Sequence, residues 1–233
     1  MVGLSKCRLY FSCGYLGFER SWLGKLSENN PRLQVVDLSE GLELLYGTHH
    51  HEEGHLHDGE AYPDPHIWGS PRLARRMVET MYRALTEIDP DGASVYAENY
   101  ARIDRRFAQL DSVLTDKLRP FKGKVFAVYH PTLSYWAADY GLRQLALEPD
   151  GKSPSPQYLR AMVDSARHVG VEVVFIQQEF DPRQAETFAR EVGCHTEIIN
   201  PLAYTWSEEI MRIADAFIPV SYTHLRAHET RRH

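Results

Sequence analysis

Short apolar runs alternate along the chain with longer amphipathic stretches, which predicts a protein of alternating β-strands and α-helices. Runs rich in β-branched and aromatic residues predict strands at 7–13, 33–38, 124–129, 144–147, 171–176 and 196–199. Apolar residues three or four apart predict helices at 18–29, 70–88, 93–118, 133–140, 157–169, 182–192 and 206–217. Because strand, helix and strand in succession form the unit of a parallel sheet, we expect an α/β fold with parallel-rich sheets flanked by helices.

Two of the predicted helices carry a recognisable apolar face. In the helix at 18–29 this face consists of Phe18, Trp22 and Leu26. In the helix at 93–118 a stripe spaced alternately three and four residues apart predicts packing, and it comprises Tyr96, Tyr100, Ile103, Phe107, Leu110, Leu114 and Leu118. The charged side of the same helix predicts a solvated surface rather than a binding patch, and it includes Arg102, Asp104, Arg105, Arg106 and Asp111.

The order of elements predicts two α/β lobes joined by one long helix. We assign residues 1–92 to an N-terminal lobe, 93–120 to the linking helix and 121–218 to a C-terminal lobe. A histidine-rich loop at 46–65 interrupts the N-terminal lobe, and residues 219–233 form a tail without apolar periodicity. Such a linking helix would limit how far the two lobes can move, and a ligand site is expected in the cleft between them.

Composition narrows the function. The formal net charge of −6 argues against a nucleic-acid binder, because neutralising phosphates needs a basic face. No apolar run is long enough for a membrane span, and the first residues lack the pattern of an export signal. The sequence contains no HExxH, no glycine-rich phosphate loop and no GxSxG elbow. We therefore expect a binding protein rather than an enzyme, acting as a monomer.

Histidines are concentrated between Tyr46 and Trp68, a stretch that holds half of the 12 histidines in the chain. Imidazole nitrogen is the commonest protein ligand of borderline divalent metals such as zinc. The polar, glycine-containing part of the stretch predicts a loop that binds metal loosely through His49, His50, His51, His55 and His57. A purification tag, a pH-sensing tract and a merely solvated tract are the competing interpretations.

Two other histidines are expected to be rigid. Pro65 fixes its own φ and restricts the backbone of Asp64, so His66 follows a stiff segment. His130 follows an apolar strand and precedes a proline. The carboxyl ends of parallel strands are where ligands bind in α/β sheets, so His130 is a candidate metal ligand. The same edge should carry Gln178, Glu179 and Asn200, which could orient a ligand or a bound water. A surface histidine with no ligand role is the competing interpretation of His130.

At the level of motifs the chain resembles a known family. The resemblance rests on LYFxxGxLGFE (9–19), an acidic histidine loop, DPHIW followed by SP (64–71), FAVYHPTLSYWAADYGL (126–142), QQEF (177–180) and INPLAY (199–204). Together, in this order, they resemble the zinc solute-binding proteins of bacterial ABC importers, the ZnuA/TroA-like group, over roughly residues 4–217.

The resemblance implies a two-lobed protein at the periplasmic or extracellular face of the membrane that captures zinc and delivers it to an ABC permease. By position, His66 and His130 match metal ligands of the family, and the loop from His49 to His57 matches its zinc-type loop. Manganese is the alternative cargo in relatives, some of which belong to an adhesin-type lipoprotein group. Histidine at position 130 and the loop favour zinc.

Three departures from the family pattern predict a fragment. Met1 falls after the family's first ligand histidine, so the export signal and the first βα unit are expected to be absent. Asn200 stands where the family usually has an aspartate ligand. The segment 220–230, VSYTHLRAHET, resembles a translated sequencing adapter, so we expect a poorly packed end and no ligand role for His224, His228 and His233.

Two other functions stay open at this point. A zinc-dependent hydrolase could use His66, His130 and Glu179 and leave one metal position for water. A simple metal buffer would bind through the loop alone. In each case metal binding needs neutral imidazoles, so affinity should fall as pH drops through the imidazole range, near 6.5 for an unperturbed group.

Overall fold

The computed structural model describes residues 6–46, 63–148 and 154–218, and within them the chain forms two compact units. The first unit comprises Met1–Val113 together with Thr132–Asp139, and the second comprises Leu114–Pro131 together with Tyr140–His233. Residues 121–218 were assigned to the C-terminal lobe from the sequence, so it was not predicted that Thr132–Asp139 belong to the first unit. The long helix α3, Ala93–Leu118, passes from one unit to the other, as expected of a linking helix.

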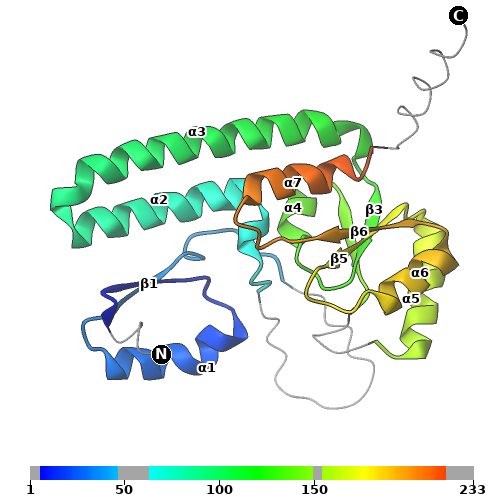
Figure 1. Ribbon diagram of the computed structural model, residues 1–233, viewed down its shortest axis with the longest axis horizontal. Helices are drawn as coiled ribbons and strands as arrows, with labels where there is room; N and C mark the ends of the chain where they lie inside the picture. Colours follow the sequence, from blue (N-terminus) through cyan, green and yellow to red (C-terminus); the bar gives the residue numbers. More distant parts are fainter. Residues whose placement is uncertain (1–5, 47–62, 149–153, 219–233) are drawn as a thin grey trace, which may run out of the picture. The chain divides into compact units, whose positions relative to one another are not determined.

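The first unit contains a two-stranded parallel sheet, three whole α-helices among its described residues and the part of α3 up to Val113 (Figure 1). Strand β1, Leu9–Ser12, pairs directly with β2, Gln34–Asp37, and the helix α1, Gly17–Asn29, connects the two strands in sequence. Helix α2, Pro71–Ile88, is capped by Ser70, whose hydroxyl accepts a hydrogen bond from the Leu73 amide. Helix α2 runs antiparallel to α3. The short helix α4, Ser134–Asp139, also belongs to this unit.

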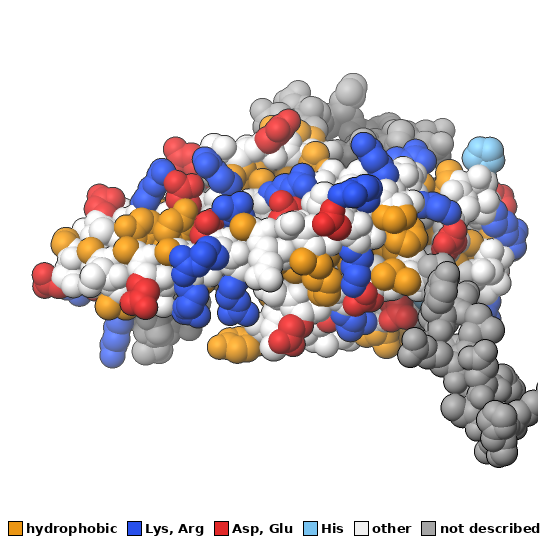
Figure 2. All heavy atoms as spheres, turned by 90° about the horizontal axis from the view of Figure 1, so that it is seen from above, with side chains coloured by type: hydrophobic (Ala, Val, Ile, Leu, Met, Phe, Trp, Pro, Cys, Tyr) orange, Lys and Arg blue, Asp and Glu red, His pale blue; other side chains and the backbone are white. Residues whose placement is uncertain are grey.

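Ion pairs join α2 to the part of α3 in the first unit. Arg75 donates to the Asp104 carboxylate from Nε at 2.8 Å and from Nη2 at 3.1 Å, and Arg72 donates to Asp111 at 2.9 Å. On the charged side of α3, which was predicted to be a solvated surface, Asp104 and Asp111 are partly covered because they form ion pairs with the neighbouring helix. Lys and Arg side chains are interspersed with Asp and Glu side chains on the face shown in Figure 2.

The second unit is a four-stranded parallel sheet in the order β4-β3-β5-β6. The strands are β3 (Val125–Val128), β4 (Arg143–Ala146), β5 (Val173–Gln177) and β6 (His195–Ile199). One face packs against α5, Pro156–Val169, and α6, Arg183–Val192, through a core that includes Ala127, Val174 and Phe188.

The other face of this sheet carries aromatic side chains. Phe126 and Phe175 are fully buried and lie 5.5 Å apart between ring centroids. Both contact Phe217, which follows helix α7, Trp206–Asp215. Because β3 and β5 are buried on both faces, their sequences are continuous apolar runs rather than alternating ones. No helix within the described residues has the length and apolar character needed to cross a membrane.

Helix α1 presents an unexpected side to the unit. Phe18 is 55% exposed and Trp22 is 43% exposed, whereas Glu19 between them is buried. The predicted apolar face was therefore assigned to the wrong side of the helix. The reason is polar: the Glu19 carboxylate accepts hydrogen bonds from the Ser12 hydroxyl and from the amides of Cys13 and Gly14, all at 3.0 Å.

The same environment affects the thiol of Cys13. Burial raises its pKa from 9.0 to about 11, and the carboxylates of Glu19 and Asp37 act in the same direction. In a variant that retains only this cysteine, with Cys7→Ser and Cys194→Ser, we expect slow reaction with a thiol reagent at pH 8 that accelerates towards pH 11. Because the folded-state pKa is raised, the associated stability is present below pH 9 and is lost as the pH rises through 11. Fast reaction at pH 8 would contradict the burial of this thiol.

Candidate metal centre

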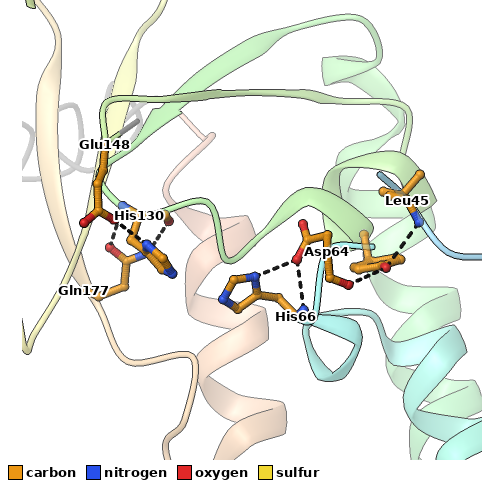
Figure 3. Close-up of polar contacts among 7 residues, drawn as sticks. Leu45, Asp64, His66, His130, Glu148 and Gln177 are labelled. Carbon is orange, nitrogen blue, oxygen red and sulfur yellow. Dashed lines mark hydrogen bonds and ion pairs between the residues drawn. The ribbon is translucent and has the colours of Figure 1, made fainter. Parts of the chain in front are cut away.

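His66 is held by a local turn in the first unit (Figure 3). Asp64 accepts two hydrogen bonds from it through Oδ1, one from the His66 amide at 2.9 Å and one from ring Nδ1 at 2.6 Å. Pro65 lies between the two residues, and the chain continues as a 3₁₀ turn, Ile67–Gly69, into the α2 cap. The side chains of both His66 and Asp64 are nearly buried, with exposures of 12% and 11%. The ring orientation is thus set within three consecutive residues.

Asp64 is itself anchored by two other segments. Its amide donates to the Leu45 carbonyl at 2.7 Å, and its carbonyl accepts from the Tyr135 hydroxyl at 2.7 Å. The Tyr135 oxygen also accepts a hydrogen bond from the Leu45 amide at 3.2 Å (Figure 3). Burial raises the pKa of Asp64, but the hydrogen bonds and charge of His66, together with Ser134, outweigh it and hold the pKa below its usual value. The carboxylate is therefore ionised and available to orient the imidazole.

His130 lies beyond the carboxyl end of β3 in the second unit. Its Nδ1 contacts the carboxylate of Glu148, which is 8% exposed. Its backbone amide donates to Oε1 of Gln177 at 3.2 Å, and its carbonyl accepts from Nε2 of the same side chain at 2.5 Å. The ring of Phe180 stacks against the imidazole, with centroids 5.6 Å apart. Backbone and ring of His130 are both fixed.

The position of His130 follows from the sheet topology. In the order β4-β3-β5-β6 the chain moves from β3 outward to β4 and then, in the opposite direction, to β5 and β6. Ligands bind at such switch points, in the crevice beyond the carboxyl ends of the two adjacent strands. His130 follows one of these strands and Gln177 ends the other. His130 was expected beyond the carboxyl end of a parallel strand and lies there, whereas its role as a metal ligand stays a prediction.

The two histidines share one arrangement: in each, Nδ1 lies against a carboxylate, so Nε2 is the nitrogen that would coordinate a cation. Metal-ligating histidines characteristically hold their other ring nitrogen to a carboxylate or carbonyl, which fixes the tautomer and strengthens the ligand. The hydrogen-bonding role of Asp64 and the contributions of Glu148 and Gln177 were not predicted from the sequence. Asp64 had a local signal, because an aspartate two residues before a histidine can bond its backbone.

The other predicted support residues do not contact His130 through the interactions described above. The side chains of Gln178 and Glu179 are exposed, and the Gln178 amide continues the pairing with β6 by donating to Ile199. Asn200 uses its side-chain oxygen to accept a 3.2 Å hydrogen bond from the Leu202 amide, and its own amide donates to Glu209. The role of Gln178, Glu179 and Asn200 in orienting a ligand or a bound water stays a prediction.

The loop histidines His49, His50, His51, His55 and His57 lie outside the described residues, as does the tail with His224, His228 and His233. The ends of the loop are described: Tyr46 and Pro63 form an isolated antiparallel bridge. The two described residues that flank the loop therefore lie side by side, and the second of them directly precedes Asp64. Among the described residues no group of three or more histidine, cysteine or acidic side chains could hold a metal ion.

A hollow of about 640 Å³ in the second unit lies elsewhere on its sheet. It is lined by residues at the amino ends of the strands, including Val125, Val173 and His195, and by Phe217. His130 follows the opposite end of β3. This hollow therefore contributes no residue to the environment of His130.

Comparison with known proteins places these observations in a family. A sequence profile described as ZnuA, "Zinc-uptake complex component A periplasmic", matches residues 1–218. The chain belongs to this family. The family is a group of solute-binding proteins and not of enzymes, in agreement with the expectation from the missing catalytic motifs.

Individual relatives of the ZnuA family agree with this assignment. The zinc-binding lipoprotein AdcA of Streptococcus pneumoniae R6 is 28% identical over 219 residues, which cover 89% of this chain and 42% of that protein. The high-affinity zinc uptake system protein ZnuA of Bacillus subtilis 168 is 29% identical over 180 residues, 75% of this chain and 56% of that protein. The chain thus spans about half the length of these curated relatives or less.

A solved structure confirms the fold class. A crystal structure of ZnuA superposes with a TM-score of 0.80 at 32% identity, covering 91% of this chain and 78% of that one. The α/β architecture with parallel sheets flanked by helices and a long linking helix is therefore the architecture of the ZnuA family.

Proposed function

We propose that this chain carries the zinc-binding part of a solute-binding protein that captures zinc outside the cytoplasmic membrane and delivers it to an ABC permease. The observation that carries the proposal is the pair of buried or half-buried imidazoles, His66 and His130, each with Nδ1 against a carboxylate. Matched relatives named for zinc binding and zinc uptake support it. The acidic net charge also fits a cation as the ligand.

Zinc rather than manganese is the proposed cargo. Imidazole nitrogen suits zinc, whereas manganese prefers carboxylate, carbonyl and water oxygen. The Asp64 and Glu148 carboxylates are engaged by imidazoles, so in this proposal they orient the ligands rather than coordinate the metal. The loop histidines act as auxiliary sites that bind zinc more weakly, and the protein works as a monomer without nucleic acid.

Zinc affinity should fall as the pH is lowered. Protons compete with the metal for imidazole nitrogen, so we expect the affinity to fall by at least about tenfold between pH 7.5 and 5. The measurement is a competition titration against a chelator whose own affinity is calibrated at each pH. An affinity that stays constant over this range would exclude histidine as the principal ligand.

A further inference from the structure

The side chain of Gln177 extends the pairing of β3 and β5 beyond the last backbone hydrogen bond. The register aligns Val128 with Phe175, and the Tyr129 amide donates to the Phe175 carbonyl at 2.9 Å. At the next residue, His130, the partner is no longer backbone but the carboxamide of Gln177, which both accepts from and donates to the His130 peptide groups. A carboxamide offers the same donor and acceptor as a peptide group, so it can take the place of a strand residue.

Gln177 is well suited to this task because its side chain is buried and its backbone is paired within the sheet. It is fully buried, and its backbone pairs with Ile199 of β6. The following amide, of Gln178, donates to the Ile199 carbonyl at 3.0 Å. The Gln177 side chain therefore starts from a fixed backbone position and holds the peptide groups of His130 at a fixed place beyond the sheet.

Glu148 is anchored from the opposite neighbour of β3. The Leu147 amide donates to the Val128 carbonyl, and the Glu148 amide donates to the Tyr129 carbonyl, both at 2.9 Å. These bonds place the Glu148 backbone directly beside the residue that precedes His130. Its carboxylate reaches ring Nδ1 from there, while Phe180 stacks on the ring. Glu148 thus restricts rotation of the imidazole, as Gln177 restricts its backbone.

Burial of the Glu148 carboxylate has no evident benefit for folding alone. An ionised carboxylate removed from water costs free energy unless it is paired, and an apolar residue at this position would avoid that cost. Carboxylates at such positions are retained where they set the tautomer and donor strength of a metal-binding imidazole. The contact of this buried carboxyl group with the His130 ring therefore favours a functional reason for its position.

We propose that Glu148 and Gln177 are positioning residues that preorganise His130 for zinc, with Nδ1 as the donor to Glu148 and Nε2 directed to the metal. This inference rests on the proposed function. We call the pair the His130 clamp. Neither residue touches the metal in this proposal; each acts through His130.

The test compares zinc affinity and the state of the His130 ring in matched variants. Loss of an outer-shell partner typically weakens metal binding 10- to 100-fold, so Glu148→Ala should weaken zinc binding by about that factor. Glu148→Gln keeps an acceptor oxygen but loses the charge, so a smaller loss is expected. Glu172→Gln is the matched control, because Glu172 is an exposed carboxylate of the same unit that pairs with Lys124. It should leave zinc affinity unchanged.

Ring spectroscopy separates positioning from a general structural effect. In zinc-free protein, nitrogen NMR should show His130 protonated at Nδ1, and Glu148→Ala should shift the ring towards a mixture of tautomers. Gln177→Met has a side chain of similar length without either hydrogen-bonding group, and it should weaken zinc binding in the same range. If Glu148→Ala fails to fold, Glu148→Gln carries the comparison.

The outcomes distinguish this inference from the proposed function. If His130→Ala weakens zinc binding while both Glu148 variants bind as tightly as the unaltered chain, the His130 clamp is wrong and the proposed function stands. If His130→Ala itself has no effect on zinc affinity, the proposed function fails at this residue. An unchanged His130 tautomer in Glu148→Ala would also overturn the clamp.

Discussion

Replacing both His66 and His130 by alanine should abolish the tightest zinc site of this chain, with a loss of more than about 100-fold in affinity. The loss should exceed that of an outer-shell variant because the substitutions remove the coordinating atoms themselves. It should also leave two carboxylates, of Asp64 and Glu148, without the imidazoles they contact. Isothermal calorimetry in the presence of a competing chelator measures the affinity directly.

Two controls make this experiment decisive. His168→Ala with His195→Ala removes the same number of imidazoles from exposed positions, and it should leave the tight site intact. Deletion of residues 49–57 removes the loop histidines and should reduce only weak binding. If the loop deletion removes the tight site and the His66/His130 double substitution does not, the chain is a metal buffer that binds through its loop.

The helices and most strands could be predicted because their signals are local. Helix α3 starts one turn before its three- and four-residue apolar spacing and ends where this spacing ends, at Leu118, and α2 begins directly after its Ser70 cap. The buried strands β3 and β5 were visible as uninterrupted apolar runs. His66 was identified because it follows Pro65, and His130 because it lies between the end of an apolar run and Pro131.

The partners of His130 could not be predicted because they are non-local. Glu148 reaches the imidazole only through the pairing of β4 with β3, and Gln177 only through the pairing of β5 with β3. A sequence shows that a strand ends, but not which strand lies beside it. The neighbouring Gln178 and Glu179 were chosen instead, although alternation along β5 turns Gln177 inward and Gln178 outward.

Glu19 was missed for a related reason. The spacing of apolar residues shows which of them share one face of a helix. It does not show whether this face or the opposite, polar face packs against the rest of the protein. In α1 the side with Glu19 is buried, because the turn after β1 presents donors that need an acceptor. Backbone amides removed from water are almost always hydrogen-bonded. The amides of the turn therefore determine that the side of α1 with Glu19 faces β1.

Glu19→Ala should therefore destabilise the first unit by roughly 4 kcal/mol. The substitution leaves the Cys13 amide and the Ser12 hydroxyl without the Glu19 acceptor, while the Gly14 amide keeps only its 2.9 Å hydrogen bond to the Ser12 hydroxyl oxygen. Each buried donor left unpaired costs about 1–3 kcal/mol. The space around Gly14 is tight, because its φ is +86° and a Cβ atom added there would lie 2.5 Å from the Ser39 hydroxyl and 2.8 Å from the Asp37 carboxylate. Glu19→Gln retains one acceptor oxygen and should cost about half as much.

The measurement is the free energy of unfolding in denaturant, followed by circular dichroism, with Glu28→Ala as the matched control. Glu28 is an exposed glutamate of the same helix, so its loss should change stability by no more than about 0.5 kcal/mol. A Glu19→Ala variant as stable as Glu28→Ala would mean that the turn finds other acceptors. A large loss for Glu19→Ala alone would establish that a buried carboxylate, rather than the aromatic residues beside it, holds α1 against the end of β1.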